Sequence, residues 1–358
     1  MSGGGTATQV LLTRGIDTPA ELVAARLDAP REDEVLVRIE AVGLCHTDLA
    51  TRAALGATPA VLGHEGCGIV EQVGAAVSAA SGIRVGERVV LSFRSCGSCE
   101  RCLGGAPAYC EQAQRLNSAG RRPDGSATVT VDGRPVFASF FGQSSFASHA
   151  LVAADACVPV GEAAPEVAAP LGCGLLTGAG AVLNVLRPGA GDRLLVVGAG
   201  GVGAAAVLAA RSEGVEVVVV EPLASRRELV ASFGAKACES LDELADPGIS
   251  HALDTSGRPE IVDRVLGLLD PLGTLAVVGL GPARAEIDVR RLMLRGLTLR
   301  GCVEGDAVPR ELVPELLRRH AAGTLPLDRL VTTFPLSEWD EAVAAQRAGR
   351  VLKPVMLP

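Results

Sequence analysis

Four cysteines lie within fifteen positions of one another, with the spacing Cys96-x2-Cys99-x2-Cys102-x7-Cys110. Four thiolates this close match the closed tetrahedral coordination of a structural zinc ion, which leaves no open position for substrate. An iron–sulfur cluster is the alternative. The bacterial ferredoxin pattern, however, has three residues before its fourth cysteine and a proline after it, whereas here the gap is seven and Glu111 follows. The spacing therefore predicts a zinc site that stabilises the fold.

A second chemical signal is the run Gly198-Ala199-Gly200-Gly201-Val202-Gly203, which contains the spacing G-x-G-x-x-G. It follows a predicted buried strand at residues 194–197 and opens a predicted helix, which is the context that the motif requires. There Gly198 permits the tight turn, Gly200 lets a pyrophosphate approach the backbone, and Gly203 lets the helix pack on the sheet. The helix N-terminus offers free N–H groups to phosphate. We expect a dinucleotide site; the alternative is a glycine-rich turn without a ligand.

The acid that accompanies such a motif is Glu221, which stands 18 positions after Gly203 at the end of a second predicted strand. A carboxylate at this place hydrogen-bonds the ribose hydroxyls of NAD and repels the 2′-phosphate of NADP. NAD is therefore the favoured cofactor. Arg226 and Arg227 follow closely and are able to accommodate a phosphate, which keeps NADP as the alternative.

The elements that position these motifs follow two patterns. The first third of the chain is glycine-punctuated and β-rich, with an alternating, half-buried strand predicted at residues 34–39 and another strand at 86–91. After about residue 160, strands alternate with helices, which predicts an α/β fold with a doubly wound parallel sheet. Strands are expected at residues 194–197, 215–220, 252–254 and 275–278, and helices at 225–233, 259–269 and 310–321.

Length and composition narrow the class of protein. The 358 residues suffice for about two domains, and 48% hydrophobic residues exclude a disordered chain. A net charge of −8 argues against nucleic acid or an anionic membrane as the main partner. The first ten residues lack the pattern of a secretory signal, and the longest uncharged apolar run, residues 194–210, contains four glycines. We expect a cytoplasmic protein without a membrane span.

Three further short motifs contain metal-ligating residue types. They are Cys45-His46-Thr47-Asp48, Gly63-His64-Glu65 and Leu171-Gly172-Cys173-Gly174, each flanked by a glycine. Taken singly, a lone cysteine is usually a small buried apolar residue and a lone histidine usually has a structural hydrogen bond. Spacing alone does not bring the three motifs together.

Jointly, these motifs resemble those of the zinc-dependent medium-chain alcohol dehydrogenases, and the resemblance covers the whole chain. The segments 140–146, 171–174 and 352–355 further resemble the benzyl (aryl) alcohol dehydrogenase branch. The resemblance implies a β-rich GroES-like catalytic domain at residues 1–160 and 299–358 with its zinc lobe at 94–112. It also implies a Rossmann dinucleotide-binding domain at residues 161–298.

For the site, the resemblance implies a catalytic zinc held by Cys45, His64 and Cys173, with water or substrate as the fourth ligand. Such a metal is a Lewis acid toward an alcohol oxygen. Asp48 would hydrogen-bond the ring of His64. Glu65 would either approach the zinc transiently or act as a buried polar bracket.

The remaining implied roles concern the proton and the cofactor. Thr47 would take the alcohol proton and pass it toward the nicotinamide ribose, while His46 and Lys353 would face the pyrophosphate. Thr177 and Val278 would line the nicotinamide. Many members of the family end the proton relay in a histidine five residues after the first zinc cysteine, but here that position is Ala50. The proton must leave through water or through His46.

The sequence thus predicts an enzyme with two zinc ions per chain that oxidises a primary aromatic or allylic alcohol to its aldehyde, reversibly, with NAD. One alternative is a thiol-dependent formaldehyde dehydrogenase, and another is a non-catalytic NAD-binding scaffold. A polyol dehydrogenase is less favoured, because Cys173 stands where that branch is expected to use a carboxylate. The expected partner is a small alcohol or aldehyde. The family resemblance implies a homo-oligomer, a dimer or tetramer.

Overall fold

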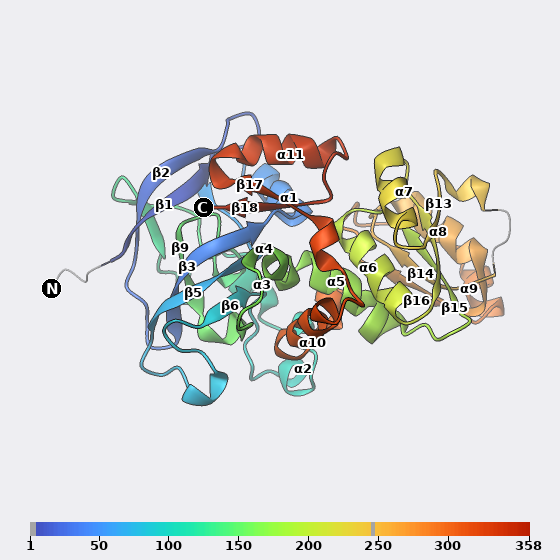
Figure 1. Ribbon diagram of the computed structural model, residues 1–358, viewed down its shortest axis with the longest axis horizontal. Helices are drawn as coiled ribbons and strands as arrows, with labels where there is room; N and C mark the ends of the chain where they lie inside the picture. The colour runs from blue at the N-terminus through green and yellow to red at the C-terminus, as the bar shows by residue number, and fades with distance from the viewer. Residues whose placement is uncertain (1–4, 245–247) are drawn as a thin grey trace. The chain divides into compact units, whose positions relative to one another are not determined.

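The computed structural model describes residues 5–244 and 248–358, which form two compact units (Figure 1). Unit 1 comprises the described residues through Cys173, together with Val308–Leu317 and Val331–Pro358. Unit 2 comprises Gly174–Ala307 and Arg318–Leu330. The domain limits expected from the sequence, at residues 160 and 299, stay predictions.

Unit 1 is built on two mainly antiparallel sheets. The smaller sheet has the order β4-β1-β2-β7-β8, and the larger has the order β10-β6-β5-β3-β18-β17, with β9 pairing to β3. The smaller sheet consists of β1 (Ala7–Thr13), β2 (Glu21–Leu27), β4 (Ala60–Val61), β7 (Val129–Val131) and β8 (Arg134–Pro135). The larger consists of β3 (Glu34–Gly43), β5 (Gly66–Val73), β6 (Arg88–Leu91), β9 (His149–Ala153), β10 (Cys157–Pro159), β17 (Val331–Pro335) and β18 (Lys353–Leu357).

Strand β3 connects the packing of the two sheets. The alternating pattern at its start predicts a strand with one buried face, and that prediction is wrong. Val35 and Val37 join an apolar cluster around Trp339, while Leu36 joins a second cluster around Val10. Because successive side chains of a strand point to opposite faces, both faces of β3 are covered in this region. Its pattern is that of a central strand between two cores.

The helices of unit 1 are short and lie at the ends of strands. Helix α1 begins directly after β3, where the side chain of Asp48 accepts a hydrogen bond from the backbone N–H of Cys45 at 3.0 Å. This contact satisfies one free donor at the helix start. The α-helices are α1 (His46–Leu55), α2 (Glu100–Leu103), α3 (Ala113–Asn117), α4 (Pro165–Ala168) and α11 (Trp339–Arg347). Helix α10 (Pro309–Ala321) belongs to unit 1 through Leu317.

Unit 2 has a parallel sheet with the order β13-β12-β11-β14-β15-β16. From β11, the next two strands in the sequence lie on one side of it, and the last three lie on the other side. This is the doubly wound dinucleotide-binding order, so the predicted α/β class is confirmed. The strands are β11 (Arg193–Val197), β12 (Glu216–Val220), β13 (Lys236–Cys238), β14 (Ile249–Asp254), β15 (Leu269–Val277) and β16 (Thr298–Gly301). The α-helices are α5 (Gly174–Gly180), α6 (Gly201–Ser212), α7 (Ala224–Ala231), α8 (Pro259–Leu268) and α9 (Val289–Leu294), and Ala181–Leu186 is a π-helical segment.

Within the described ranges, no single helix is long and apolar enough to cross a membrane. One bent pair, Pro165–Gly172 with Gly174–Leu186, meets the length and composition criteria only when its two parts are taken together.

Candidate metal centres and dinucleotide site

The four cysteines of the predicted zinc lobe converge in unit 1. The Sγ atom of Cys99 lies 3.4 Å from that of Cys102 and 4.0 Å from that of Cys110, and Cys96 lies 3.9 Å from Cys102. A tetrahedron with Zn–S bonds of about 2.3 Å has edges of about 3.8 Å. The sulfur positions therefore fit a four-thiolate zinc site.

The ionisation of these thiols also favours a bound cation. A hydrogen bond from the backbone of Ser98 is the main cause that lowers the pKa of Cys96 to about 6. Burial and the neighbouring Cys99 thiol raise the pKa of Cys102 to about 12. Thiols this crowded resist ionising together, because each thiolate repels the next. A dication offsets that repulsion, which is the electrostatic reason for a metal at this place.

The second cluster brings together three residues that are far apart in the sequence. Cys45 precedes α1, His64 precedes β5, and Cys173 follows the turn Ala169–Gly172. One ligand atom from each of these three residues and from Glu65 lies within 4.8 Å of all the others. In the described part of the chain, the buried Nε2 of His64 has no hydrogen-bond partner. A buried nitrogen without a partner, beside two sulfur atoms, fits a metal held by Cys45, His64 and Cys173.

The pKa of Cys45 favours the binding of a cation by this cluster. A hydrogen bond with Cys173 is the main cause that lowers the pKa of Cys45 well below its ordinary range, although burial opposes the shift and His64 assists it. The thiolate, not the thiol, is the form that binds a metal. The cluster is therefore electrostatically suited to hold zinc.

Asp48 holds the imidazole of His64 from behind. Its Oδ1 lies 3.0 Å from Nδ1 of His64 and accepts the backbone N–H of Gly63 at 3.1 Å, while Oδ2 accepts the N–H of Cys45. Both side chains are fully buried. A carboxylate at Nδ1 fixes the proton on that nitrogen and leaves Nε2 as the electron-pair donor. Asp48 thus orients the ring and joins the backbone of two ligand segments.

Glu65 and Lys353 form a buried ion pair next to the cluster. The Nζ atom of Lys353 lies 2.7 Å from Oε1 and 2.5 Å from Oε2 of Glu65, and it donates to the carbonyl of Leu44 at 3.0 Å. Burial raises the pKa of Glu65 to about 7, and the charge of Lys353 opposes that rise. Lys353 is 3% exposed. Its predicted contact with the pyrophosphate stays a prediction, and its ammonium is already occupied in this structure.

The first turn of α1 carries the residues predicted to handle the proton. The hydroxyl of Thr47 lies 3.7 Å from Sγ of Cys45, which places it beside the candidate metal site. His46 is exposed, and so is Ala50 one turn further along the helix. The roles of Thr47 and His46 remain predictions.

In unit 2, the glycine-rich run connects β11 to α6 as the sequence predicts. Gly198 has a φ of +91°, a left-handed conformation that glycine adopts without strain. A Cβ atom on Gly203 would collide with the carbonyl oxygen of Gly198, whereas a Cβ atom on Gly200 would meet nothing within 4 Å. The run is therefore tightly packed at Gly203 and has open space beside Gly200. The open position at the start of α6 fits a phosphate group.

Glu221 follows β12 and is 3% exposed. Its carboxylate accepts the N–H of Ala199 at 2.8 Å and the N–H of Leu223 at 2.9 Å. The acid is thus bonded directly to the glycine-rich turn, and a carboxylate has further lone pairs with which to accept ribose hydroxyls. Arg226 lies 3.8 Å from the same carboxylate. Contacts of both residues with a cofactor stay predictions.

Thr177 and Val278 belong to the same unit. The hydroxyl of Thr177, in α5, donates to Oε2 of Glu304 at 3.4 Å. Val278 follows β15 and is half-buried, and its N–H donates to the carbonyl of Asp254 at 2.9 Å. Their predicted positions along the nicotinamide remain predictions.

The segment Phe140–Phe146 has neighbours that the sequence did not reveal. The ring of Phe141 stacks on the imidazole of His64 with centroids 4.5 Å apart, and Phe140 meets the same imidazole edge-on at 5.3 Å. Gln143 donates its amide N–H to the backbone carbonyl of His64 at 2.9 Å. Since no periodic or spacing rule connects residue 143 with residue 64, only the resemblance of the segment to one branch of the family singled it out.

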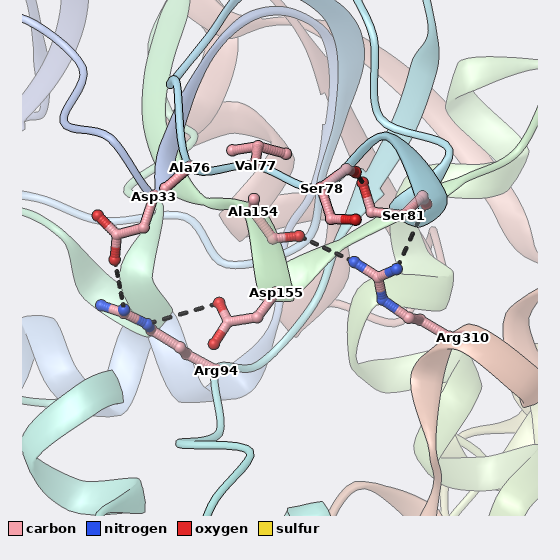
Figure 2. Close-up of a pocket in the computed structure, with 9 residues that line it drawn as sticks. All are labelled: Asp33, Ala76, Val77, Ser78, Ser81, Arg94, Ala154, Asp155 and Arg310. Carbon is pink, nitrogen blue, oxygen red and sulfur yellow. Dashed lines mark hydrogen bonds and ion pairs between the residues drawn. The ribbon is translucent and has the colours of Figure 1, made fainter.

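A pocket of about 280 Å³ in unit 1 contains none of the predicted site residues (Figure 2). Arg94 lies between Asp33 and Asp155, with nitrogen–oxygen distances of 3.7 and 3.6 Å. Arg310 donates to the backbone carbonyls of Ser81 and Ala154, as Figure 2 shows. Both cations face anionic or carbonyl partners of the chain itself. Two arginines and two aspartates line the pocket, so its formal charges balance overall.

Comparison with known proteins supports the same class. Residues 31–162 match the model of the alcohol dehydrogenase GroES-like domain, and residues 201–322 match that of the zinc-binding dehydrogenases. A geraniol dehydrogenase from Castellaniella defragrans is 41% identical, covering 98% of this chain and 97% of its own length.

Two solved structures are similar over nearly the whole chain. An alcohol dehydrogenase zinc-binding domain protein from Burkholderia ambifaria has a TM-score of 0.94 at 40% identity, covering 99% of this chain and 100% of its own. A benzyl alcohol dehydrogenase from Acinetobacter calcoaceticus has a TM-score of 0.92 at 36% identity, covering 98% of this chain and 99% of its own.

The chain belongs to the zinc-dependent medium-chain alcohol dehydrogenases. It is an oxidoreductase that acts on a small alcohol, and its cofactors are zinc and NAD. The predicted family, fold class and type of enzyme are thereby confirmed.

Proposed function

We propose that this enzyme oxidises a primary alcohol with an aromatic or allylic carbon next to the hydroxyl-bearing carbon, and reduces the aldehyde in the reverse direction. The observation that carries the proposal is the cluster of Cys45, His64 and Cys173 with the imidazole stacked on Phe141. An aromatic wall beside the metal ligands favours flat, unsaturated substrates. The names of the relatives, a geraniol and a benzyl alcohol dehydrogenase, agree with this class.

We assign two zinc ions to each chain, one to the cluster of four cysteines and one to Cys45, His64 and Cys173. When bound at the latter site, zinc supplies a Lewis acid that lowers the pKa of an alcohol. Thr47, whose hydroxyl lies beside Cys45, relays the alcohol proton: its oxygen accepts that proton while its own O–H proton passes on toward the nicotinamide ribose. Gly200 and the start of α6 hold the pyrophosphate of NAD, and Glu221 accepts hydrogen bonds from the adenosine ribose.

We also propose that the enzyme is a homo-oligomer that associates through β16. This strand ends the parallel sheet, so one row of its backbone N–H and C=O groups is unpaired within the sheet. Exposed apolar side chains lie in β16 and in the segments next to it, and an isologous pairing of two such edges would cover them. They are Leu272, Val289, Met293, Leu294, Leu299 and Val303. Sedimentation of the purified protein tests this: a monomer at micromolar concentration contradicts it.

The deciding experiment for the activity is NADH formation from NAD with benzyl alcohol, geraniol and ethanol, alongside a zinc determination. The proposal expects two zinc ions per chain and higher kcat/KM for the two unsaturated alcohols than for ethanol. A folded Cys45→Ser variant that binds NAD should lose turnover and one zinc ion. Full activity of this variant contradicts the assigned site.

Two other results identify the alternatives. Activity on formaldehyde that appears only after a small thiol is added indicates the thiol-dependent formaldehyde dehydrogenase. A wild-type protein that binds NAD, holds one zinc ion and turns over none of these substrates indicates a scaffold.

A further inference from the structure

The segment Ser139–Ser145 has an unusual backbone. Ser139, Phe141 and Ser144 have φ values of 59°, 51° and 56°, all in the left-handed region. Side chains with a Cβ atom avoid this region, so such conformations persist only where the surroundings enforce them, and they gather at functional sites. The contacts that enforce this conformation therefore indicate what the segment does.

These contacts lead to the residues just before His64. The hydroxyl of Ser144 donates to the carbonyl of Val61 at 2.6 Å, and the N–H of Ser145 donates to the carbonyl of Gly63 at 2.9 Å. The N–H of Phe146 donates to the carbonyl of Leu62 at 3.0 Å. Hydrogen bonds thus hold residues 144–146 against residues 61–63, which directly precede His64.

Gln143 lies where this segment meets His64. Its Nε2 donates to the carbonyls of His64 at 2.9 Å and Ser92 at 3.4 Å. Its Oε1 accepts the N–H of Gly66 at 3.2 Å and the hydroxyl of Ser145 at 3.0 Å. The side chain is 2% exposed, and both ends of its amide are occupied. The amide is therefore hydrogen-bonded to the backbone of both neighbours of Glu65, His64 and Gly66.

The same contacts continue to the third metal ligand. Ser92, which is fully buried, donates its hydroxyl to the carbonyl of Gly172 at 2.7 Å. That carbonyl directly precedes Cys173. Hydrogen bonds of Gln143 and Ser92 thus link the backbone of His64 to the carbonyl of Gly172, the residue before Cys173.

We propose that Gln143 is a positioning residue that fixes His64 relative to Cys173 and so sets the geometry of the catalytic zinc site. This inference rests on the proposed function, because it takes these residues as zinc ligands. Only an uncharged amide supplies two donors and an acceptor in this arrangement. Gln143→Glu places a carboxylate oxygen against two carbonyl oxygens, and Gln143→Met leaves buried backbone groups without partners.

A matched control lies just after the lobe of four cysteines, at the end of α3. The side chain of Asn117 accepts the N–H of Arg94 at 2.8 Å and donates to the carbonyls of Arg94 and Ala113, each at 2.8 Å. This amide is also buried and also fully bonded, but it joins the two ends of the lobe instead of the catalytic ligands. Asn117→Asp therefore matches Gln143→Glu in chemistry and differs in the site affected.

The experiment measures zinc loss as a chelator such as dipicolinate is titrated into the holoenzyme. In Gln143→Met and Gln143→Glu, the catalytic zinc should leave at chelator concentrations about 10- to 100-fold lower than in the wild type, as for other groups that orient metal ligands. The lobe zinc should leave at the wild-type concentration. The zinc that remains in Cys45→Ser identifies the lobe site. Asn117→Asp should show the opposite pattern.

A second readout is the visible spectrum after cobalt replaces the catalytic zinc, since the ligand-field bands report the ligand geometry. They should shift in both Gln143 variants. Ser92→Ala removes only the contact with Gly172 and serves where a Gln143 variant does not fold; it should lower zinc retention in the same direction by a smaller factor.

Wild-type zinc retention with an unchanged cobalt spectrum in folded Gln143 variants overturns the inference. So does equal weakening of both sites, which would reveal a general loss of stability. A wild-type enzyme with only one zinc ion contradicts the proposed function itself, whereas two zinc ions in the wild type, together with wild-type resistance to the chelator in every folded Gln143 variant, contradict this inference alone.

Discussion

The carboxylate of Asp48 lies 3.0 Å from Nδ1 of His64, and neither side chain has any exposed surface. The same carboxylate accepts the backbone N–H groups of Cys45 and Gly63. One acid therefore joins the segments of Cys45 and His64, two of the proposed zinc ligands, and leaves Nε2 of the imidazole as the nitrogen available to a metal. We therefore expect zinc binding at this site to depend on both carboxylate oxygens of Asp48, so that replacing one of them with an NH2 group should weaken it.

Asp48→Asn is that change. The amide has one acceptor oxygen in place of two, so its NH2 group must face a donor, either Nδ1 of His64 or a backbone N–H. We expect zinc affinity at the catalytic site to fall about 10- to 100-fold. We also expect a loss of about 1–3 kcal/mol of folding free energy for the unsatisfied donors. Chelator competition and urea denaturation measure the two effects, and unchanged values in both would exclude this role for Asp48.

The ion pair of Glu65 and Lys353 allows a test by double substitution. Lys353→Met leaves a buried carboxylate without its partner, which should destabilise the fold by about 3–5 kcal/mol. Glu65→Gln alone should also destabilise it, because the ammonium is left buried. Combining the two changes should restore much of the loss. Urea denaturation of the four proteins gives the coupling energy, and additive losses would show that the two residues stabilise the fold independently.

Two of the glycines in the dinucleotide motif predict different effects of the same substitution. Gly203→Ala should destabilise the protein, because the new methyl group meets the carbonyl of Gly198. Gly200→Ala has open space around its methyl group, so the protein should fold with near wild-type stability. If the pyrophosphate lies there, affinity for NADH should fall at least about tenfold, since close backbone approach is lost.

Thermal denaturation and fluorescence titration with NADH separate these effects. Wild-type NADH affinity in Gly200→Ala would show that the cofactor does not approach the backbone at this residue.

The absence of a histidine at position 50 predicts how activity depends on pH. Activity should rise with pH without a step that residue 50 could cause, because alanine does not titrate. Ala50→His should raise the rate at low pH if the relay to solvent is incomplete, since a histidine on the exposed face of α1 would exchange protons with water. The measurement is kcat against pH for both proteins. Superimposable profiles would show that the proton leaves by another route.

Much of the fold follows from local sequence patterns. The apolar run of β11 and the glycines after it predict the turn and helix α6, because spacing and φ requirements there are local. The four cysteines predict their own convergence for the same reason. In contrast, the double burial of β3 depends on two cores assembled from distant segments, which an alternating pattern in one strand does not reveal.

The cluster of proposed catalytic zinc ligands, in contrast, could not be predicted from local sequence patterns. Cys45, His64 and Cys173 are separated by up to 128 positions, and only family resemblance placed them together. Gln143 had no signal of its own, since a glutamine acquires its partners only when β6 and the residues before β5 are packed. The engagement of Lys353 with Glu65 likewise depends on the last strand of the chain, β18, pairing with β3.

The position of β3 has a consequence for how the protein denatures. Because alternate residues of one strand belong to two apolar clusters, neither cluster can melt while the other keeps its native packing. The residues around both metal sites should accordingly lose structure in one cooperative step, with a calorimetric enthalpy equal to the van't Hoff enthalpy for that step. Amide protons of β1 and β5, in different sheets, should then exchange with solvent through the same global opening.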